Sequence, residues 1–73
     1  MYSQTQISLS QLLTKGRQKL GIGQIRLSKL LNIKLHRLSD LEKSRSFPSP
    51  MEEERLRRQM LEILEEANRG QRL

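Results

Sequence analysis

Leucines at helical spacing are the feature of this chain that most restricts its fold. They recur at intervals of three and four residues, as they do along the apolar side of an α-helix. The chain has 73 residues, so the helices they mark must share one small core. Because the sequence has one Phe, one Tyr and no Trp, this core is expected to be aliphatic. The pattern predicts a compact all-α domain.

Caps and breakers define the first two helices. Ser8 offers a capping hydroxyl with Gln11 as its capping-box partner, and Gly21 is expected to end the helix that follows. A second, shorter helix is expected over residues 24–31. It is followed by Asn32, which tolerates a left-handed backbone better than other residues except glycine.

A short and a long helix are expected in the second half of the chain. The short one covers about residues 35–43. Residues 47–50, Phe-Pro-Ser-Pro, then break the chain, and Ser49 caps a long helix over residues 51–68 that Gly70 is expected to end. This long helix either closes the core or pairs with a second copy as a homodimer. The apolar positions predicted for the core are Leu9, Leu12, Leu13, Leu20, Leu27, Leu30, Leu31, Leu38, Leu41, Leu56, Met60, Ile63, Leu64 and Ala67.

Positive charge is concentrated in the first 46 residues. This segment contains nine Lys and Arg but only two acidic residues, whereas the part from residue 47 onward contains five arginines and six glutamates. The whole chain carries a net charge of +6. A basic body with a near-neutral end is typical of a protein that binds a polyanion. A basic surface that serves only solubility is the alternative interpretation.

The composition argues against an enzyme, a metal site and a cofactor. The chain has no cysteine and one histidine, His36, which excludes thiolate and polyhistidine metal sites. Carboxylates such as Glu53 lie four residues from an arginine, the pattern of a solvated helix face. Residues 21–23, Gly-Ile-Gly, follow no strand and so do not match a phosphate loop. No catalytic residue and no small-molecule ligand is expected.

The first ten residues are polar and uncharged, with no apolar stretch long enough for a secretory signal or a membrane span. We therefore expect a cytoplasmic protein that does not enter a membrane. Residues 1–7 are expected to form a flexible polar arm, residues 8–68 the folded domain and residues 69–73 a short tail.

Residues 24–43 carry the pattern of a helix-turn-helix. Two helices that cross steeply through a short turn need a small residue at their contact, a turn residue able to take a positive φ and apolar residues that fix the crossing. Ser28 and Asn32 supply the first two. The apolar positions are Leu27, Leu31, Ile33, Leu38 and Leu41.

The same region resembles the lambda-repressor/Cro-like (XRE-type) family. The resemblance lies in Lys-Leu-Gly-Ile-Gly-Gln-Ile-Arg-Leu-Ser-Lys-Leu-Leu-Asn-Ile at 19–33, Leu-Ser-Asp-Leu-Glu at 38–42 and Phe-Pro-Ser-Pro at 47–50. It is ungapped over about residues 17–50 and includes Gln24, which helix packing alone would not require. The resemblance implies a four- to five-helix bundle whose third helix enters the major groove of duplex DNA.

The resemblance also implies a role for individual residues. Gln24 and the free N–H groups at the start of the second helix would dock on a phosphate. Glu42 is expected to be structural. The residues that would read base edges are Leu35, His36, Arg37 and Asp40. Those that would neutralise phosphates beside the groove are Lys34, Lys43 and Arg45.

Cations stand at the starts of two helices. Arg26 lies in the first turn of the second helix, after Gly23, and Lys34 immediately precedes the third. A cation at either place opposes the helix dipole, at a cost of a few tenths of a kcal/mol or more. A phosphate that arrives there would explain both residues, and screening by solvent would explain them equally well.

Several residues depart from the family pattern. Asp40 is an anion where the resemblance puts DNA; it can accept from a cytosine amine, or pair with Arg37 or Lys43. Ser44 stands where the family commonly has glycine. Gly16 replaces an apolar residue, which is expected to weaken packing and helix propensity.

Three functions remain open from the sequence. The first is a DNA-binding repressor or activator of phage or mobile-element type, acting as a dimer on a palindromic site. The second is a phage-encoded protein that binds host RNA polymerase, to inhibit initiation or cause antitermination. It is favoured by the apolar Ile25 and Leu35, by Asp40 and by the polar arm with Tyr2. The third is an antitoxin or excision accessory protein.

Overall fold

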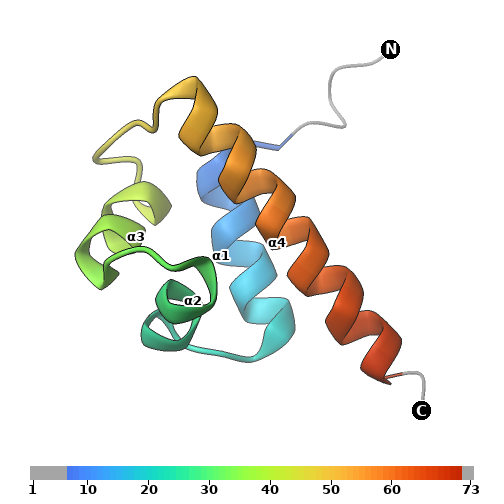
Figure 1. Ribbon diagram of the computed structural model, residues 1–73. Coiled ribbons are helices and arrows are strands. Elements are labelled where there is room, and N and C mark those ends of the chain that lie inside the picture. The colour runs from blue at the N-terminus through green and yellow to red at the C-terminus, as the bar shows by residue number, and fades with distance from the viewer. Residues whose placement is uncertain (1–6, 72–73) are drawn as a thin grey trace.

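Four helices account for most of the chain in the computed structural model, which describes residues 7–71. They are α1 (Leu9–Leu20), α2 (Gln24–Leu31), α3 (Leu35–Glu42) and α4 (Pro50–Gln71). Helix α1 packs against both α3 and α4, while α2 packs on α3 and also touches α4 (Figure 1). The all-α fold with a long C-terminal helix is therefore confirmed for the described part of the chain. None of the described helices is both long enough and apolar enough to cross a membrane.

Three helices end in the same way. Beyond α1, α2 and α3, one residue takes a left-handed backbone: Gly21 (φ 70°), Asn32 (φ 58°) and Ser44 (φ 59°). In each case the next amide reaches back over the last turn, as in the Schellman motif. The bonds are Ile22 N to Arg17 O (3.2 Å), Ile33 N to Ser28 O (3.0 Å) and Arg45 N to Asp40 O (2.9 Å). Gly21 and Asn32 were expected at these positions, whereas the conformation of Ser44 was not.

Serine hydroxyls cap the two long helices. The Ser8 hydroxyl accepts from the Gln11 amide at 3.2 Å at the start of α1. The Ser49 hydroxyl accepts from the Glu52 amide, also at 3.2 Å, at the start of α4. Both caps confirm the predicted starts. Helix α4 continues through Gly70, beyond the end expected near residue 68, because this glycine does not take the positive φ that would end the helix.

The core is aliphatic, as predicted, and lies where the four helices meet. Its fully buried side chains are Leu13, Leu27, Leu31, Leu38, Leu56 and Met60. Leu30 was expected in this core, but 46% of it is exposed. Helix α2 has eight residues, and the side of it that carries Leu30 turns away from α3 toward α4.

Gly16 lies where α1 packs against Met60 of α4, a role that the sequence did not indicate. Gly16 is buried, and a Cβ atom at this position would come too close to the Cε atom of Met60 unless that side chain shifted. The absence of a side chain is what gives Met60 its place between the two helices. Residues 1–6 of the predicted arm, including Tyr2, and residues 72–73 of the predicted tail lie outside the described residues.

Candidate nucleic-acid interface

Helices α2 and α3 begin without a side-chain cap. The residues before them are Gly23 and Lys34, both with extended backbones, and neither accepts a hydrogen bond from the helix amides through its side chain. Neither first turn contains an acid. The first amides of both helices are therefore left for water or for an anion from outside.

A turn of three residues, 32–34, joins α2 to α3. The buried Ser28 lets the two helices approach and satisfies its own hydroxyl by donating to the Ile25 carbonyl at 2.7 Å. Leu27, Leu31 and Leu38 are fully buried, so the opposite side of α3 faces solvent. As a result Leu35 is 43% exposed and the side chain of His36 is 88% exposed.

Several cations of α2 and α3 have no carboxylate partner. Arg26, Lys29, Lys34 and Lys43 are exposed, and none of them forms an ion pair with another residue in the range 7–71. Lys29 was not among the residues singled out from the sequence. Its position three residues after Arg26, on the same side of a helix, could have indicated it.

Asp40 is partly neutralised by two basic residues of its own region. Its carboxylate lies 3.2 Å from the Arg45 Nε atom and 3.3 Å from the His36 Nε2 atom, the latter being a charged pair only when His36 is protonated. The turn at Ser44 brings Arg45 back over α3. Asp40 therefore pairs with neither Arg37 nor Lys43, the partners expected from helical spacing.

Arg37 is held by α4. Its Nη2 atom lies 2.6 Å from the Glu52 carboxylate, and its Nη1 atom donates to the Ser46 hydroxyl. The hydrogen bond to Glu52 raises the pKa of Arg37, and the same bond lowers the pKa of Glu52. In this arrangement the guanidinium ties α3 to the start of α4, so it is not directed at an outside ligand.

Glu42 joins three helices at one carboxylate. Its side chain is 4% exposed and accepts from Arg17 at 2.9 and 3.0 Å and from the Gln24 amide at 2.9 Å. The hydrogen bond to Glu42 raises the pKa of Arg17. A structural Glu42 is what the family resemblance implied. The Gln24 side chain points to this carboxylate, which leaves its backbone amide as the group that can meet a phosphate.

Comparison with known proteins assigns the chain to no family. The chain matches no protein-family model, and neither the curated proteins nor the solved structures contain a match to it. Its function must therefore be argued from its own residues.

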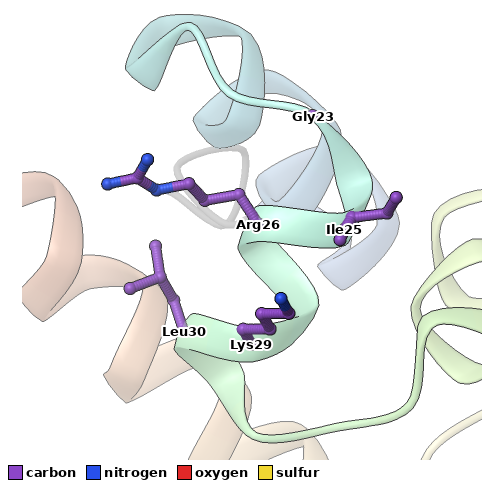
Figure 2. Close-up of a pocket in the computed structure, with 5 residues that line it drawn as sticks. All are labelled: Gly23, Ile25, Arg26, Lys29 and Leu30. Carbon is purple, nitrogen blue, oxygen red and sulfur yellow. The ribbon is translucent and has the colours of Figure 1, made fainter.

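The α2 side chains extend in two directions. Figure 2 shows Ile25 on the side of α2 that faces α3, with Arg26 and Leu30 extending to the other side, where α4 lies. Ile25 is 60% exposed and lines one hollow together with Arg26, Lys29 and Leu30, at the edge of the hollow that lies toward α3. The predicted site residues thus fall into two groups, which adjoin at the start of α2.

The residues near α3 form the first group. We call Lys34, Leu35, His36, Lys43 and Arg45, together with the free amides at the start of α2, the α3 face. Its side chains are exposed, and it carries a net positive charge even with Asp40 counted. Among residues 7–71, no three His, Asp or Glu side chains lie close enough to hold a metal ion.

Proposed function

We propose that the protein is a helix-turn-helix transcription regulator of the phage or mobile-element type, and that its α3 face binds duplex DNA. In this proposal α2, the turn over residues 32–34 and α3 form the motif, and α3 lies in the major groove. Lys34, Lys43 and Arg45 neutralise phosphates, while Leu35 and His36 reach base edges, Leu35 through a thymine methyl group.

One observation carries this proposal: two neighbouring helices begin without caps or acids, and the exposed Lys34 and Lys43 at the two ends of α3 have no carboxylate partners among the described residues. Amides at a helix start bind anions, and here no capping side chain or first-turn acid would compete with a phosphate for them. The short turn after Asn32 and the buried Leu38 supply the support that a recognition helix needs.

Two of the predicted contact residues, Gln24 and Arg37, have side chains that are already held by glutamates, so we assign them different roles. Gln24 would meet a phosphate through its backbone N–H, since its side chain donates to Glu42. Arg37 would orient α3 through Glu52 rather than read a base. Base reading then rests mainly on Leu35 and His36, with Asp40 limited by its pairing with Arg45.

An NMR titration tests the proposal. Backbone amide shifts of labelled protein are followed as a mixed-sequence duplex is added at about 20 mM and about 150 mM salt. We expect shifts at Gln24 and at residues 34–36 and 43, with an affinity that falls steeply with salt; three or four phosphate contacts give a slope of about −3 in log K against log salt.

A matched pair of variants sharpens the test. Lys34→Gln/Lys43→Gln removes two cations from the α3 face, while Lys15→Gln/Lys19→Gln removes two exposed cations from α1. In the first variant the slope of log K against log salt should become shallower by about two phosphate contacts, and in the second it should change little. Amides that stay still at low salt, where electrostatic binding is easiest, would overturn DNA binding.

Exposed apolar side chains favour a second candidate, a protein that binds host RNA polymerase. Ile25, in the first turn of α2, is 60% exposed, and Leu35, the first residue of α3, is 43% exposed. Apolar residues within a polar rim suit a protein interface. If duplex DNA causes no shifts, binding to purified polymerase is the next measurement. Loss of that binding in Ile25→Ser, with retained folding, would support this second candidate.

A further inference from the structure

A second surface lies between α2 and the C-terminal half of α4. It consists of two shallow hollows that meet at Leu30. One hollow is lined on α2 by Gly23, Ile25, Arg26 and Lys29. The other is lined on α4 by Ile63, Arg69 and three glutamates, Glu62, Glu65 and Glu66. We call this region the α2–α4 surface; Figure 2 shows the residues of its α2 half.

The α2–α4 surface is divided by charge. Its α2 half is basic and its α4 half is acidic, with the half-exposed Leu30 at the boundary. Among the described residues, Arg26 and Lys29 pair with no carboxylate, and Glu62 and Glu65 pair with no cation. Only Glu66 is paired, with Arg69 at 3.6 Å. Opposite charges thus lie on one surface without neutralising each other.

We propose that a second copy of this chain docks on the α2–α4 surface. A two-fold axis near Leu30 would set the basic half of each copy against the acidic half of the other, because the same patch serves both partners in an isologous dimer. The two Leu30 side chains would meet at the centre, flanked by Ile63. Each charge contact then occurs twice, which gives the surface a self-complementary pattern.

This assignment moves Arg26 from the DNA-contact residues to the dimer surface. Arg26 precedes Lys29 by three residues and Leu30 by four, so the three side chains share one side of α2. Ile25 lines the same hollow, but its side chain extends toward α3, away from Arg26 and Leu30 (Figure 2). Self-association is measured without DNA, so its failure and the failure of DNA binding can be told apart.

A charge-swap experiment tests the proposed dimer. Arg26→Glu/Lys29→Glu makes both halves of the surface acidic, and Glu62→Lys/Glu65→Lys makes both halves basic. Each variant alone should be a monomer in sedimentation equilibrium, under conditions where the natural chain associates. An equimolar mixture should associate again, because each interface half then joins an acidic patch to a basic one.

Three controls complete the experiment. Lys15→Glu/Lys19→Glu carries a charge change equal to that of the α2 variant but lies outside both hollows, so it should associate like the natural chain. Helical content by circular dichroism checks that each variant is folded. The natural chain should dissociate roughly tenfold more readily in high salt than in low salt, as screened charge pairs do. A natural chain that stays monomeric at low salt, or variants that do not associate when mixed, would overturn the proposal.

Discussion

The two long helices and the two short helices of this protein differ in how their N-terminal ends are stabilised. Helices α1 and α4 begin under serine hydroxyls, and α4 has Glu52 and Glu53 in its first turn. Helices α2 and α3 have neither caps nor acids at their starts. Helix α4 places glutamates beside its arginines, while α2 and α3 leave several cations unpaired among residues 7–71, as α1 does with Lys15 and Lys19.

This difference shows where local stability has been given up. A side-chain cap contributes about 1 kcal/mol, and an acid near a helix start adds a few tenths more. Helices α2 and α3 lack both contributions and depend instead on buried leucines and on the Glu42 carboxylate. An anion bound at their starts would restore part of what is missing. The contrast therefore agrees with the proposed DNA site. If solvent alone screened the cations at these helix starts, anion binding would not be linked to the stability of α2 and α3.

Removal of Glu42 should have the largest effect, because this buried carboxylate joins α1 to both short helices. Glu42→Ala leaves Arg17 and the Gln24 amide without their shared partner. We expect the free energy of unfolding to fall by about 2 kcal/mol, measured by urea denaturation. DNA affinity should fall as well, since α2 loses a contact that orients it. Glu42→Gln, which keeps the shape of the side chain, should lose less; equal losses would mean that the charge of the carboxylate, not its shape, maintains the contact.

A cap added to α3 should separate stability from binding. Lys34 has an extended backbone at the N-cap position, so Lys34→Asp supplies a capping oxygen and removes a cation from the helix start. The free energy of unfolding should rise by about 1 kcal/mol, while the affinity for duplex DNA at low salt should fall at least about tenfold.

The matched control for this variant is Lys43→Asp at the other end of α3. It makes the same change in charge, but near the helix C-terminus, where an anion is unfavourable. Affinity should fall there too, while stability should drop slightly rather than rise. If Lys34→Asp lowered stability as Lys43→Asp does, the start of α3 would not be short of a cap, and the comparison between the two pairs of helices would fail.

Most of the fold could be predicted because its determinants are local. Ser8, Gly21, Asn32 and Ser49 act on backbone groups within a few residues, so each could be read from its place in the sequence. Gly16 could not be understood in this way, because its reason lies in Met60, on a different helix. Leu30 shows the same limit, since apolar spacing predicts a helix side but not whether a neighbour covers it.

The candidate site was less predictable than the fold. Which cations are free depends on ion pairs that cross between elements: Arg37 is held by Glu52, fifteen residues away, and Arg17 by Glu42, twenty-five residues away. Helical spacing gives only pairs three or four residues apart. The sequence could therefore indicate a basic region, but not which of its cations are paired across elements.

The Arg37–Glu52 pair should contribute a smaller, pH-dependent effect. Because the folded-state pKa of Glu52 is lowered, its contribution is fully present above the ordinary glutamate pKa and is lost as the pH falls through the lowered value. Glu52→Gln should cost about 1 kcal/mol near pH 6, and this difference from the natural chain should shrink toward about pH 3. Glu54→Gln is the control, because Glu54 is exposed and lies 3.7 Å from Arg58. A difference that did not change with pH would contradict a role for the ionised pair.

The smallest expected effect tests the three left-handed helix ends. Ser44 carries a Cβ atom at φ 59°, where an ordinary residue is strained, whereas Gly21 has no such strain and Asn32 tolerates the conformation well. Ser44→Gly should therefore raise the free energy of unfolding by about 0.5 kcal/mol, the relief of backbone strain being partly offset by a more flexible unfolded chain. Asn32→Gly should gain less, and Gly21→Ala should lose about 1 kcal/mol. DNA affinity should stay unchanged in Ser44→Gly if this residue acts only on the backbone. A loss of affinity without a loss of stability would instead mean that a rigid Ser44 holds Arg45 and Asp40 in place for the α3 face.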